Sequence, residues 1–173
     1  MVATESSGLW GQASPVAPPV GSRYQLQDSL RSVACPAVGR CVAVGSYEEG
    51  ASSHERPMFV SETATGWNLA AKLTLPAGAS SGAQGTLASV ACPAVTQCVA
   101  AGGFLDRAAT PEQPILASGP LASLGRALVA STRSLARSRR ISTSEPDPLH
   151  AVSCSSKHAC VAVGREIAVA STK

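Results

Sequence analysis

Apolar residues fall along this chain in short runs separated by small and polar residues, and one such run returns three times. Each copy begins with leucine, carries two cysteines with five residues between them, and ends on Val-Ala-Val-Gly or Val-Ala-Ala-Gly. The copies are residues 30–45, 87–102 and 149–164. A motif that recurs in this way indicates a repeat architecture, in which each unit buries its apolar face against the next.

Each unit offers four runs with the length and composition of β-strands. In the first unit they are residues 30–34, 41–47, 58–63 and 67–75. The Val-Ala-Val run is short, apolar and bounded by turn residues, which is typical of an inner strand covered on both faces. We therefore predict an all-β fold of four-stranded antiparallel sheets.

The repeat has a period of 57 residues over most of the chain. Residues 1–10 match residues 58–67, so we expect the chain to begin inside a unit. Two sets of residues should occupy equivalent strand positions in successive sheets: Trp10, Trp67 and Leu124, and Val33, Val90 and Val152.

The predicted organisation is a single repeat domain, residues 1–173. Residues 1–29 are the tail of a preceding repeat and a linker, 30–86 the first repeat, 87–148 the second, and 149–173 a truncated third. The second repeat is longer than the first and contains a degenerate basic segment, residues 122–146. Because its leucines have a partly helical spacing, a short helix over 122–140 is the alternative to a degenerate fourth strand. Residues 167–171 are expected to replace the third strand in the third repeat.

All six cysteines lie in the repeated motif. If each pair flanks a five-residue hairpin loop, its Cα atoms stand about 4.5 Å apart across the two strands, which is within the range that a disulfide spans. We predict the bonds Cys35–Cys41, Cys92–Cys98 and Cys154–Cys160. Closing so short a loop stabilises the fold by about 2 kcal/mol.

Disulfides persist in oxidising compartments, so the cysteines favour a secreted or cell-surface protein. The first residues, however, have neither the basic nor the apolar region of a signal peptide. We expect that the chain is a fragment or that its true start lies upstream, and the alternative is a cytosolic protein with six reduced thiols. No apolar run approaches the roughly 18 residues of a membrane span.

The composition limits the kinds of site that the chain can build. Apolar residues make up 45% of the chain, but aromatic residues make up only 3%. The small side chains suit closely packed sheets rather than a deep aromatic pocket. The formal net charge of +3 is too small to indicate a nucleic-acid or membrane partner.

Four residues near the end of the chain have the chemistry of zinc ligands: His150, Cys154, His158 and Cys160. Neither histidine recurs in the other repeats, so a disulfide between the two cysteines and two surface histidines is the favoured interpretation. The sequence contains no H-E-x-x-H, no C-x-x-C and no phosphate-binding glycine motif. We therefore predict no metal and no cofactor.

The pattern L-x-S-V-x-C-P-x4-C-x-A-V-G, followed by a strand ending in Gly66 and Trp67, resembles the β-propeller-like repeats common in exported actinobacterial proteins. These are distant relatives of the Asp-box repeats of sialidases and of photosystem-assembly-factor-like propellers. The resemblance covers residues 1–120 and 149–173 and implies four-stranded propeller blades. The high alanine content and the preference for arginine over lysine fit an actinobacterial source with a GC-rich genome.

The chain departs from this family in two ways. An Asp-box has a Ser-x-Asp-x-Gly turn before its tryptophan, and residues 61–67 lack the aspartate. Closed propellers typically have about four to eight blades, whereas this chain has about three repeats. The chain is therefore expected to be an incomplete ring or an assembling half of one, with a different threefold fold such as a β-trefoil as the alternative.

Sialidase-type catalysis would need a tyrosine and glutamate pair among convergent arginines. The tyrosines are Tyr24 and Tyr47, and Phe104 matches Tyr47 in the next repeat, which indicates a packing position. Several carboxylates lie in predicted loops with no fixed partner visible, and we expect them to serve solubility: Glu48, Glu49, Glu55 and Asp106. No catalytic residue is predicted.

The one concentrated run of charge lies between Arg133 and Arg140. Such a run can contact phosphates, but no aromatic residue is interleaved for stacking on bases. An exposed basic loop is the favoured interpretation over a nucleic-acid site.

The function predicted from these observations is a non-catalytic, exported, propeller-type repeat module for macromolecular binding or scaffolding at the cell surface. The alternative is a partial chain of a sialidase- or lyase-like propeller enzyme. The sequence does not name the partner macromolecule. Open sheet edges should favour self-association, unless residues 9–16 complete the sheet that residues 149–171 begin.

Overall fold

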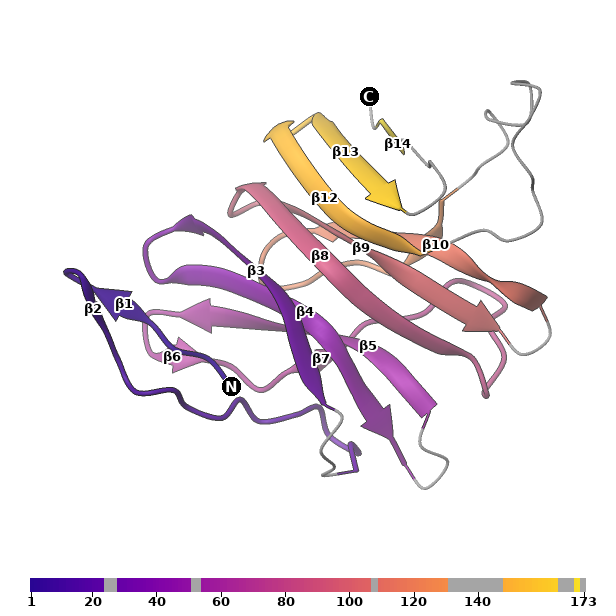
Figure 1. Ribbon diagram of the computed structural model, residues 1–173, viewed down its shortest axis with the longest axis horizontal. Helices are drawn as coiled ribbons and strands as arrows, with labels where there is room; N and C mark the ends of the chain where they lie inside the picture. The colour runs from indigo at the N-terminus through magenta and orange to yellow at the C-terminus, as the bar shows by residue number, and fades with distance from the viewer. Residues whose placement is uncertain (24–27, 51–53, 107–108, 131–147, 165–169, 172–173) are drawn as a thin grey trace.

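The structure, a computed structural model, describes residues 1–23, 28–50, 54–106, 109–130, 148–164 and 170–171. In these residues the chain is all-β: the strands pair antiparallel and no helix occurs. Three sheets follow one another in chain order, and a small N-terminal hairpin lies beside the first (Figure 1). The predicted all-β fold is confirmed. The described residues do not form a closed ring.

The first sheet contains five strands: β3 (Ser29–Ala37), β4 (Arg40–Glu49), β5 (His54–Thr63), β6 (Gly66–Trp67) and β7 (Ala71–Lys72). Their order is β3-β4-β5-β6, and β7 also pairs with β5. The predicted strands are present. However, the first three extend further than expected, and the run predicted as the fourth is divided into β6 and β7.

The second sheet is formed by β8 (Gln84–Ala94), β9 (Gln97–Asp106), β10 (Ala109–Gly119) and β11 (Leu128–Val129). Strand β11 pairs Val129 with Ile115, and one period earlier β7 pairs Lys72 with Met58. The fourth strand of this unit therefore keeps its register. The alternative of a helix over 122–140 is wrong for residues 122–130, and the rest of that range lies outside the described residues.

The third sheet is formed by β12 (Leu149–Ser156), β13 (Ala159–Gly164) and β14 (Ala170–Ser171). Strand β14 pairs Ser171 with Val161, as β5 pairs Ser61 with Val42 in the first sheet. A third strand is therefore present at the end of the predicted range 167–171. Residues 165–169 lie outside the described residues.

The N-terminal hairpin, β1 (Glu5–Ser6) and β2 (Leu9–Trp10), reproduces the outer part of a unit. Its pairing of Glu5 with Trp10 is the pairing of Glu62 with Trp67, one period later. The expectation that residues 9–16 complete the third sheet is wrong for the described residues. Strands β1 and β2 form a sheet of their own and lie at the opposite end of the molecule from β12 and β13 (Figure 1).

The cysteine motif closes the first hairpin of every unit. Each predicted disulfide is formed, with its two Cα atoms 4.0 Å apart. The predicted five-residue loop, however, is wrong. In the first sheet the strands continue past the cysteines until Ala37 pairs with Arg40, so the turn is only Val38 and Gly39. A register shift between Ala34 and Ala37 accommodates the cysteine pair within the hairpin.

The glycine that ends each motif permits a second register shift. Leu30 pairs with Gly45, and the register shifts between Leu30 and Ser32. A Cβ atom on Gly45 would lie 1.8 Å from the carbonyl oxygen of Ser29. Only glycine can therefore occupy this position without moving the backbone.

Two of the three core clusters lie between the sheets, and the third is formed by residues of the first sheet together with Val16 of the N-terminal segment. Where the first and second sheets meet, Val42 and Val44 of β4 pack in one cluster with Leu87 and Val90 of β8. Where the second and third sheets meet, the corresponding residues pack in the same way: Val99, Ala101, Leu149 and Val152. The two outer residues of Val-Ala-Val thus face the following sheet, and the central alanine faces the other way, which explains why the run is apolar throughout.

Polar contacts also repeat at the two junctions. The Ser32 hydroxyl accepts a hydrogen bond from the backbone N–H of Val90 at 3.2 Å. The Ser89 hydroxyl accepts one from Val152 N–H at 3.1 Å. These serines occupy the same position of the motif, and the third copy has Ala151 there.

The two ends of the row of sheets leave repeat positions uncovered. Val33, Val90 and Val152 occupy equivalent register positions, as predicted, opposite Ala43, Ala100 and Ala162. Their exposed fractions, however, are 58%, 6% and 9%. At the other end Val161 and Val163 are 47% and 45% exposed, while their first-sheet counterparts are fully buried. The difference arises because, among the described residues, no further sheet packs against Val33 at one end or against Val161 and Val163 at the other.

Candidate functional site

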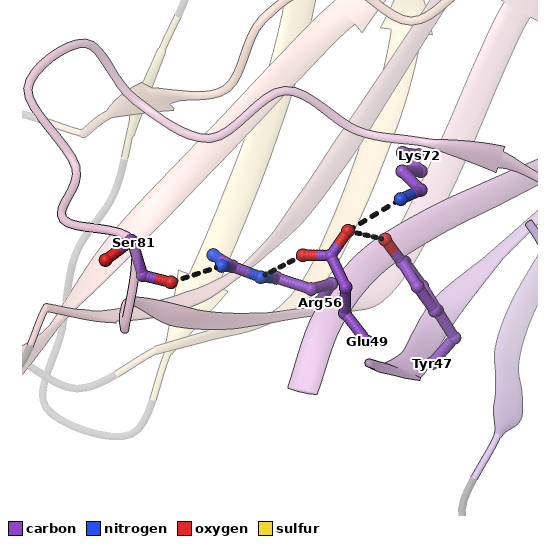
Figure 2. A network of polar contacts seen from close by, with 5 residues as sticks. All are labelled: Tyr47, Glu49, Arg56, Lys72 and Ser81. Carbon is purple, nitrogen blue, oxygen red and sulfur yellow. Dashed lines mark hydrogen bonds and ion pairs between the residues drawn. The ribbon is translucent and has the colours of Figure 1, made fainter. Parts of the chain in front are cut away.

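The most connected group of polar side chains surrounds Glu49 at the end of β4 (Figure 2). Lys72 Nζ donates to Glu49 Oε1 at 2.6 Å, and Arg56 Nε donates to Oε2 at 2.9 Å. The Tyr47 hydroxyl donates to Oε1 at 3.3 Å. A second nitrogen of Arg56 donates to the carbonyl oxygen of Ser81 at 2.6 Å. The network thus joins three strands of the first sheet to the segment that leads into the second.

These contacts change the proton affinity of two groups. The hydrogen bond from Lys72 is the main reason why the pKa of Glu49 lies below its ordinary value, and burial opposes this only in part. The pKa of Tyr47 is raised, first by burial of its ring and then by the negative charge of Glu49. Lys72 Nζ also lies 5.7 Å from the centre of the Tyr47 ring. The network therefore holds an ionised carboxylate beside a neutral phenol.

The network lines a groove of about 410 Å³. Residues 73–80 and Arg126 of the second unit also line it. Basic side chains outnumber acidic ones in this lining. The groove is wide open to solvent, and the residues that line it include little aromatic surface apart from Tyr47, so it does not resemble a deep pocket for a small molecule.

The second sheet does not repeat this network. One period after Tyr47, Glu49, Arg56 and Lys72, it has Phe104, Asp106, Gln113 and Val129. Phe104 is buried in the junction between the first and second sheets. The network therefore belongs to the first sheet and has no counterpart at the equivalent positions of the second.

The tyrosines give no nucleophile in the described part of the chain. Tyr47 is only 1% exposed and packs with Ala43, Met58 and Val60. Its ring is thus a packing element, as the match with Phe104 suggested. Tyr24 lies outside the described residues.

The four candidate zinc ligands do not form a metal site. Cys154 and Cys160 are bonded to each other, so neither thiolate is available to a metal. His150 in β12 and His158 in the turn between β12 and β13 are both exposed. No group of three or more potential ligands occurs among the residues that the structure describes.

Three of the four carboxylates, Glu49, Glu55 and Asp106, have fixed partners, contrary to the expectation that they serve solubility alone. Glu55 accepts hydrogen bonds from Ser46 Oγ at 2.5 Å and from Arg31 at 3.4 Å. Asp106 accepts from both the hydroxyl and the backbone N–H of Ser80, at 2.6 and 3.1 Å. Glu48 is buried, and its Oε2 atom makes no hydrogen bond within the described part.

Sequence analysis missed Arg56 and Lys72, the two cations of the network. Arg56 lies 7 residues after Glu49 and Lys72 lies 23 residues after it, and neither belongs to the repeated motif. The repeat could have revealed them. The positions one period later, Gln113 and Val129, are uncharged, so the charges of Arg56 and Lys72 are specific to the first unit. The basic run between Arg133 and Arg140 lies outside the described residues.

No protein-family model matches the chain, and a search of curated proteins also gave no match. The resemblance to propeller repeats therefore rests on the quoted motif. Among the described residues, no helix has the length and apolar character needed to cross a membrane.

Proposed function

We propose that this chain is a non-catalytic, exported repeat module of the propeller type that binds other macromolecules through the two ends of its row of sheets. The observation that supports this most strongly is the exposure of motif valines at the ends. Val33 is largely exposed at one end, and Val161 and Val163 are half exposed at the other. Their counterparts are buried between sheets. The end faces thus carry the same apolar residues that pack against a neighbouring sheet elsewhere in the chain. Apolar surface that stays exposed in a folded protein is typical of an interaction site.

The disulfides support export. Three short-range bonds join all six cysteines, and no free cysteine remains. Such bonds persist in oxidising compartments. They also suit a module that has to keep its shape outside the cell, where no reducing system breaks the bonds.

The alternative is a partial chain of a sialidase- or lyase-like propeller enzyme. One observation favours it, namely that Tyr47 and Glu49 share a hydrogen bond close to Arg56. The burial of Tyr47 and its raised pKa argue against it, because the phenol would have to lose its proton while facing a carboxylate. Both oxygens of Glu49 are also held by cations. The network is therefore better suited to holding strands together than to catalysis.

A photo-cross-linking side chain placed at Val33 or Val163 tests the binding function. The matched control is Val38, which is fully exposed but lies in the turn between β3 and β4. The labelled chain is mixed with the extracellular fraction of the cells that produce it. We expect discrete adducts at Val33 and Val163, identified by mass spectrometry, and none at Val38. Equal labelling at all three positions would contradict the proposal.

Assays with fluorogenic sialosides and with acidic polysaccharides test the alternative. We expect no turnover by the purified, oxidised chain. Turnover that Tyr47→Phe and Glu49→Gln both abolish, while the chain remains folded, would establish the enzyme and overturn the proposal.

A further inference from the structure

We propose that the groove beside the Glu49 network binds an acidic polysaccharide through the carboxylate groups of that polymer. All of the residues that line the groove lie between Tyr47 and Arg126, in the first two units. The site is therefore separate from the two end faces and adds to the proposed function, which concerns those faces. Its charge, its available hydrogen-bond donors, its open shape and its absence from the second sheet support the proposal.

The lining of the groove carries more positive than negative charge. Its basic residues are Arg56, Lys72 and Arg126, and its acidic residue is Glu49. The pKa of Glu49 lies below its ordinary value, so this carboxylate is ionised at neutral pH. One negative charge thus stands against three positive charges. An excess of one sign of charge along a groove attracts ligands of the opposite sign, here anions.

Arg126 is the cation that the Glu49 network does not use. Within the part of the chain that the structure describes, its guanidinium makes no hydrogen bond and no ion pair, and the residue is exposed. The backbone beside it is fixed, because Ala127 is fully buried and its N–H donates to Thr74 O at 2.9 Å. A guanidinium presents a planar fork of donors that matches a carboxylate. Arg126 is therefore suited to bind a carboxylate of the ligand.

Lys72 also keeps donors available to a ligand. An ammonium has three N–H donors, and among the described residues Nζ donates to Glu49 alone. The Lys72 side chain is 44% exposed, whereas that of Arg56 is only 15% exposed and donates to both Glu49 and Ser81 O. Figure 2 shows the two cations approaching Glu49 from different sides. Lys72 and Arg126 are thus the cations that a ligand reaches, and Arg56 serves to join the strands.

A turn in the lining supplies two backbone donors. Ala79 N–H donates to Pro76 O at 3.2 Å and closes a tight turn, in which Gly78 has a φ of +85°. Ala77 and Gly78 are exposed, and neither backbone N–H donates to a group in the described ranges. Successive N–H groups at a turn commonly bind the oxygens of an anion. The turn therefore adds neutral donors to the charges of Lys72 and Arg126.

The shape of the groove favours a polymer over a small ligand. The groove has a volume of about 410 Å³ and is open to solvent. Pockets for small molecules enclose most of the ligand surface, which this groove does not do, whereas a chain can lie across it. The exposed lining residues Thr74, Ala77 and Gly78 are small and offer a hydroxyl and backbone groups. Such groups can form hydrogen bonds with the hydroxyls of a sugar chain.

The same lining distinguishes a polysaccharide from other polyanions. Proteins bind single-stranded nucleic acid largely by stacking bases on aromatic side chains, but Tyr47 is the aromatic residue of this lining and is only 1% exposed. A protein partner is usually anchored by a large side chain in a fitted pocket, and the open groove offers no such pocket. An acidic polysaccharide needs neither feature, because its carboxylates and hydroxyls are bound by polar groups.

The charges of the groove are not required for the packing of a unit. One period after Arg56 and Lys72, the second sheet has Gln113 and Val129. That sheet nevertheless forms the same strands and packs against its neighbours in the same way. The charges thus belong to one unit and not to the repeat, as expected of a binding site.

Titration of the purified, oxidised chain with polygalacturonate tests the site by calorimetry at low ionic strength. The matched ligand is the fully methyl-esterified polymer, which has the same sugar backbone without the charges. We expect the acid form to bind, with an affinity that falls as salt is added, and the ester not to bind. No binding of the acid form at low salt, or equal binding of the ester, would overturn the proposal.

Arg126→Gln should weaken the binding roughly 3- to 10-fold, because a charge-assisted hydrogen bond to a carboxylate is lost. Thermal unfolding of this variant should be unchanged, since its guanidinium makes no hydrogen bond or ion pair in the described chain. The matched control is Arg40→Gln, an exposed residue at the opposite end of β4 from Glu49. It removes the same charge and should leave the affinity unchanged. An equal loss with both variants would show that only net charge matters and would overturn the groove.

Glu49→Gln separates ligand binding from the structural role of the network. The change removes the negative charge of the lining, while the amide oxygen still accepts a hydrogen bond from Lys72. The affinity for polygalacturonate should therefore rise roughly 2- to 5-fold, although the folded state loses stability. If the affinity falls while the chain remains folded, the carboxylates of the polymer do not lie in this groove.

Amide NMR spectra locate the ligand on the molecule. Adding polygalacturonate should shift the backbone signals of Ala77 and Gly78 in the turn of the groove. The signals of Val38 and Gly39, in the turn between β3 and β4, should stay in place. The reverse pattern would place the ligand elsewhere and overturn the site.

Polyglutamate and oligothymidylate test the class of polymer. Both carry repeated negative charges, and we expect each to bind at least about tenfold more weakly than polygalacturonate at the same ionic strength. Equal affinity for either would overturn the assignment to a polysaccharide.

The outcomes also separate the groove from the end faces. If polygalacturonate fails to bind while the cross-linker at Val33 or Val163 captures a macromolecule, the groove proposal is wrong and binding through the ends stands. If the polymer binds as described and the cross-linkers yield no adduct, the groove stands and the proposed function of the ends is wrong.

Discussion

At the scale of single residues, the serine of the repeated motif does more than fit a strand. Ser32 and Ser89 lie on edge strands of their sheets, and each supplies the acceptor for a backbone N–H on the edge strand of the following sheet. A backbone donor that faces another sheet would otherwise have to remain hydrated or unpaired. Each serine hydroxyl thus supplies the hydrogen-bond acceptor for an edge-strand N–H and helps to fix the position of the next sheet.

Replacing Ser89 by alanine should therefore lower the free energy of unfolding by about 1 kcal/mol. The Val152 N–H would lose its acceptor while the backbone stayed in place. Urea denaturation measures the difference. Ser153→Ala is the matched control, because Ser153 is exposed and its counterparts Ala34 and Ala91 are alanines already, so it should be neutral.

The Glu49 network gives a prediction for pH. Since the pKa of Glu49 is lower in the folded chain, the folded state holds this proton less readily than the unfolded state. Its contribution to stability is therefore present above the ordinary pKa and is lost as the pH falls through the lowered one.

Glu49→Gln should remove this contribution, so wild type and variant should converge in stability as the solution is acidified. Thermal unfolding over a series of acidic pH values checks this. Lys72→Gln should weaken the same dependence, because the Lys72 hydrogen bond is its largest cause. A gap between wild type and Glu49→Gln that stayed constant with pH would contradict the assignment.

At the scale of elements, the first hairpin of each unit combines two register shifts, a disulfide and a glycine. The shift near the leucine of the motif brings a backbone carbonyl toward the opposite strand, and the glycine leaves room for it. The distance from a Cβ atom at this position to that carbonyl would be 1.8 Å at Gly45, 1.9 Å at Gly102 and 2.6 Å at Gly164. The recurring Gly is therefore a steric requirement of the hairpin.

Gly102→Ala should consequently destabilise the chain by about 1–3 kcal/mol, since either the strand or its partner has to move. Gly164→Ala should cost less, because the clash is milder and lies in the third sheet, which has a neighbour on only one side. Chemical denaturation of both variants tests the order. The reverse order would show that the hairpins are not equivalent in this respect.

At the scale of the whole molecule, residues at the same position of the motif contribute differently to the free energy of unfolding. Val90 and Val152 lie inside junctions, whereas Val33 lies at the open end, although all three pair with an alanine in the same register. In repeat proteins stability is close to a sum of unit and neighbour contributions. The second sheet, with a neighbour on each side, should therefore be the most stable part of the chain.

Val90→Ala should lower the free energy of unfolding by about 2 kcal/mol, through lost burial and the cavity that remains. Val33→Ala should change it little when the protein is dilute enough to be monomeric. The comparison is made by denaturation at low protein concentration. A large loss at Val33 under these conditions would mean that the N-terminal segment covers it in solution.

The sequence by itself determined the strands, the order of the units and the disulfides. A strand position follows from apolar alternation and turn residues, and the partner of Cys35 follows from five intervening residues, so both are set by local spacing. The register of the N-terminal hairpin was likewise implied by the period of 57 residues. The register of β11 was not, because the sequence left a degenerate strand or a helix open at that point.

Only the tertiary structure decided which copies of a repeated position are buried and which polar groups meet. Val33 and Val90 have the same local sequence, and burial depends on whether another sheet lies beyond. Lys72 reaches Glu49 from 23 residues away, because β7 pairs with β5 beside β4. The separation of the two ends also depended on the arrangement of all three sheets, so the expected closure by residues 9–16 could not be judged from spacing. Local pattern sets what a strand can pair with, and the packing of whole sheets sets what remains exposed.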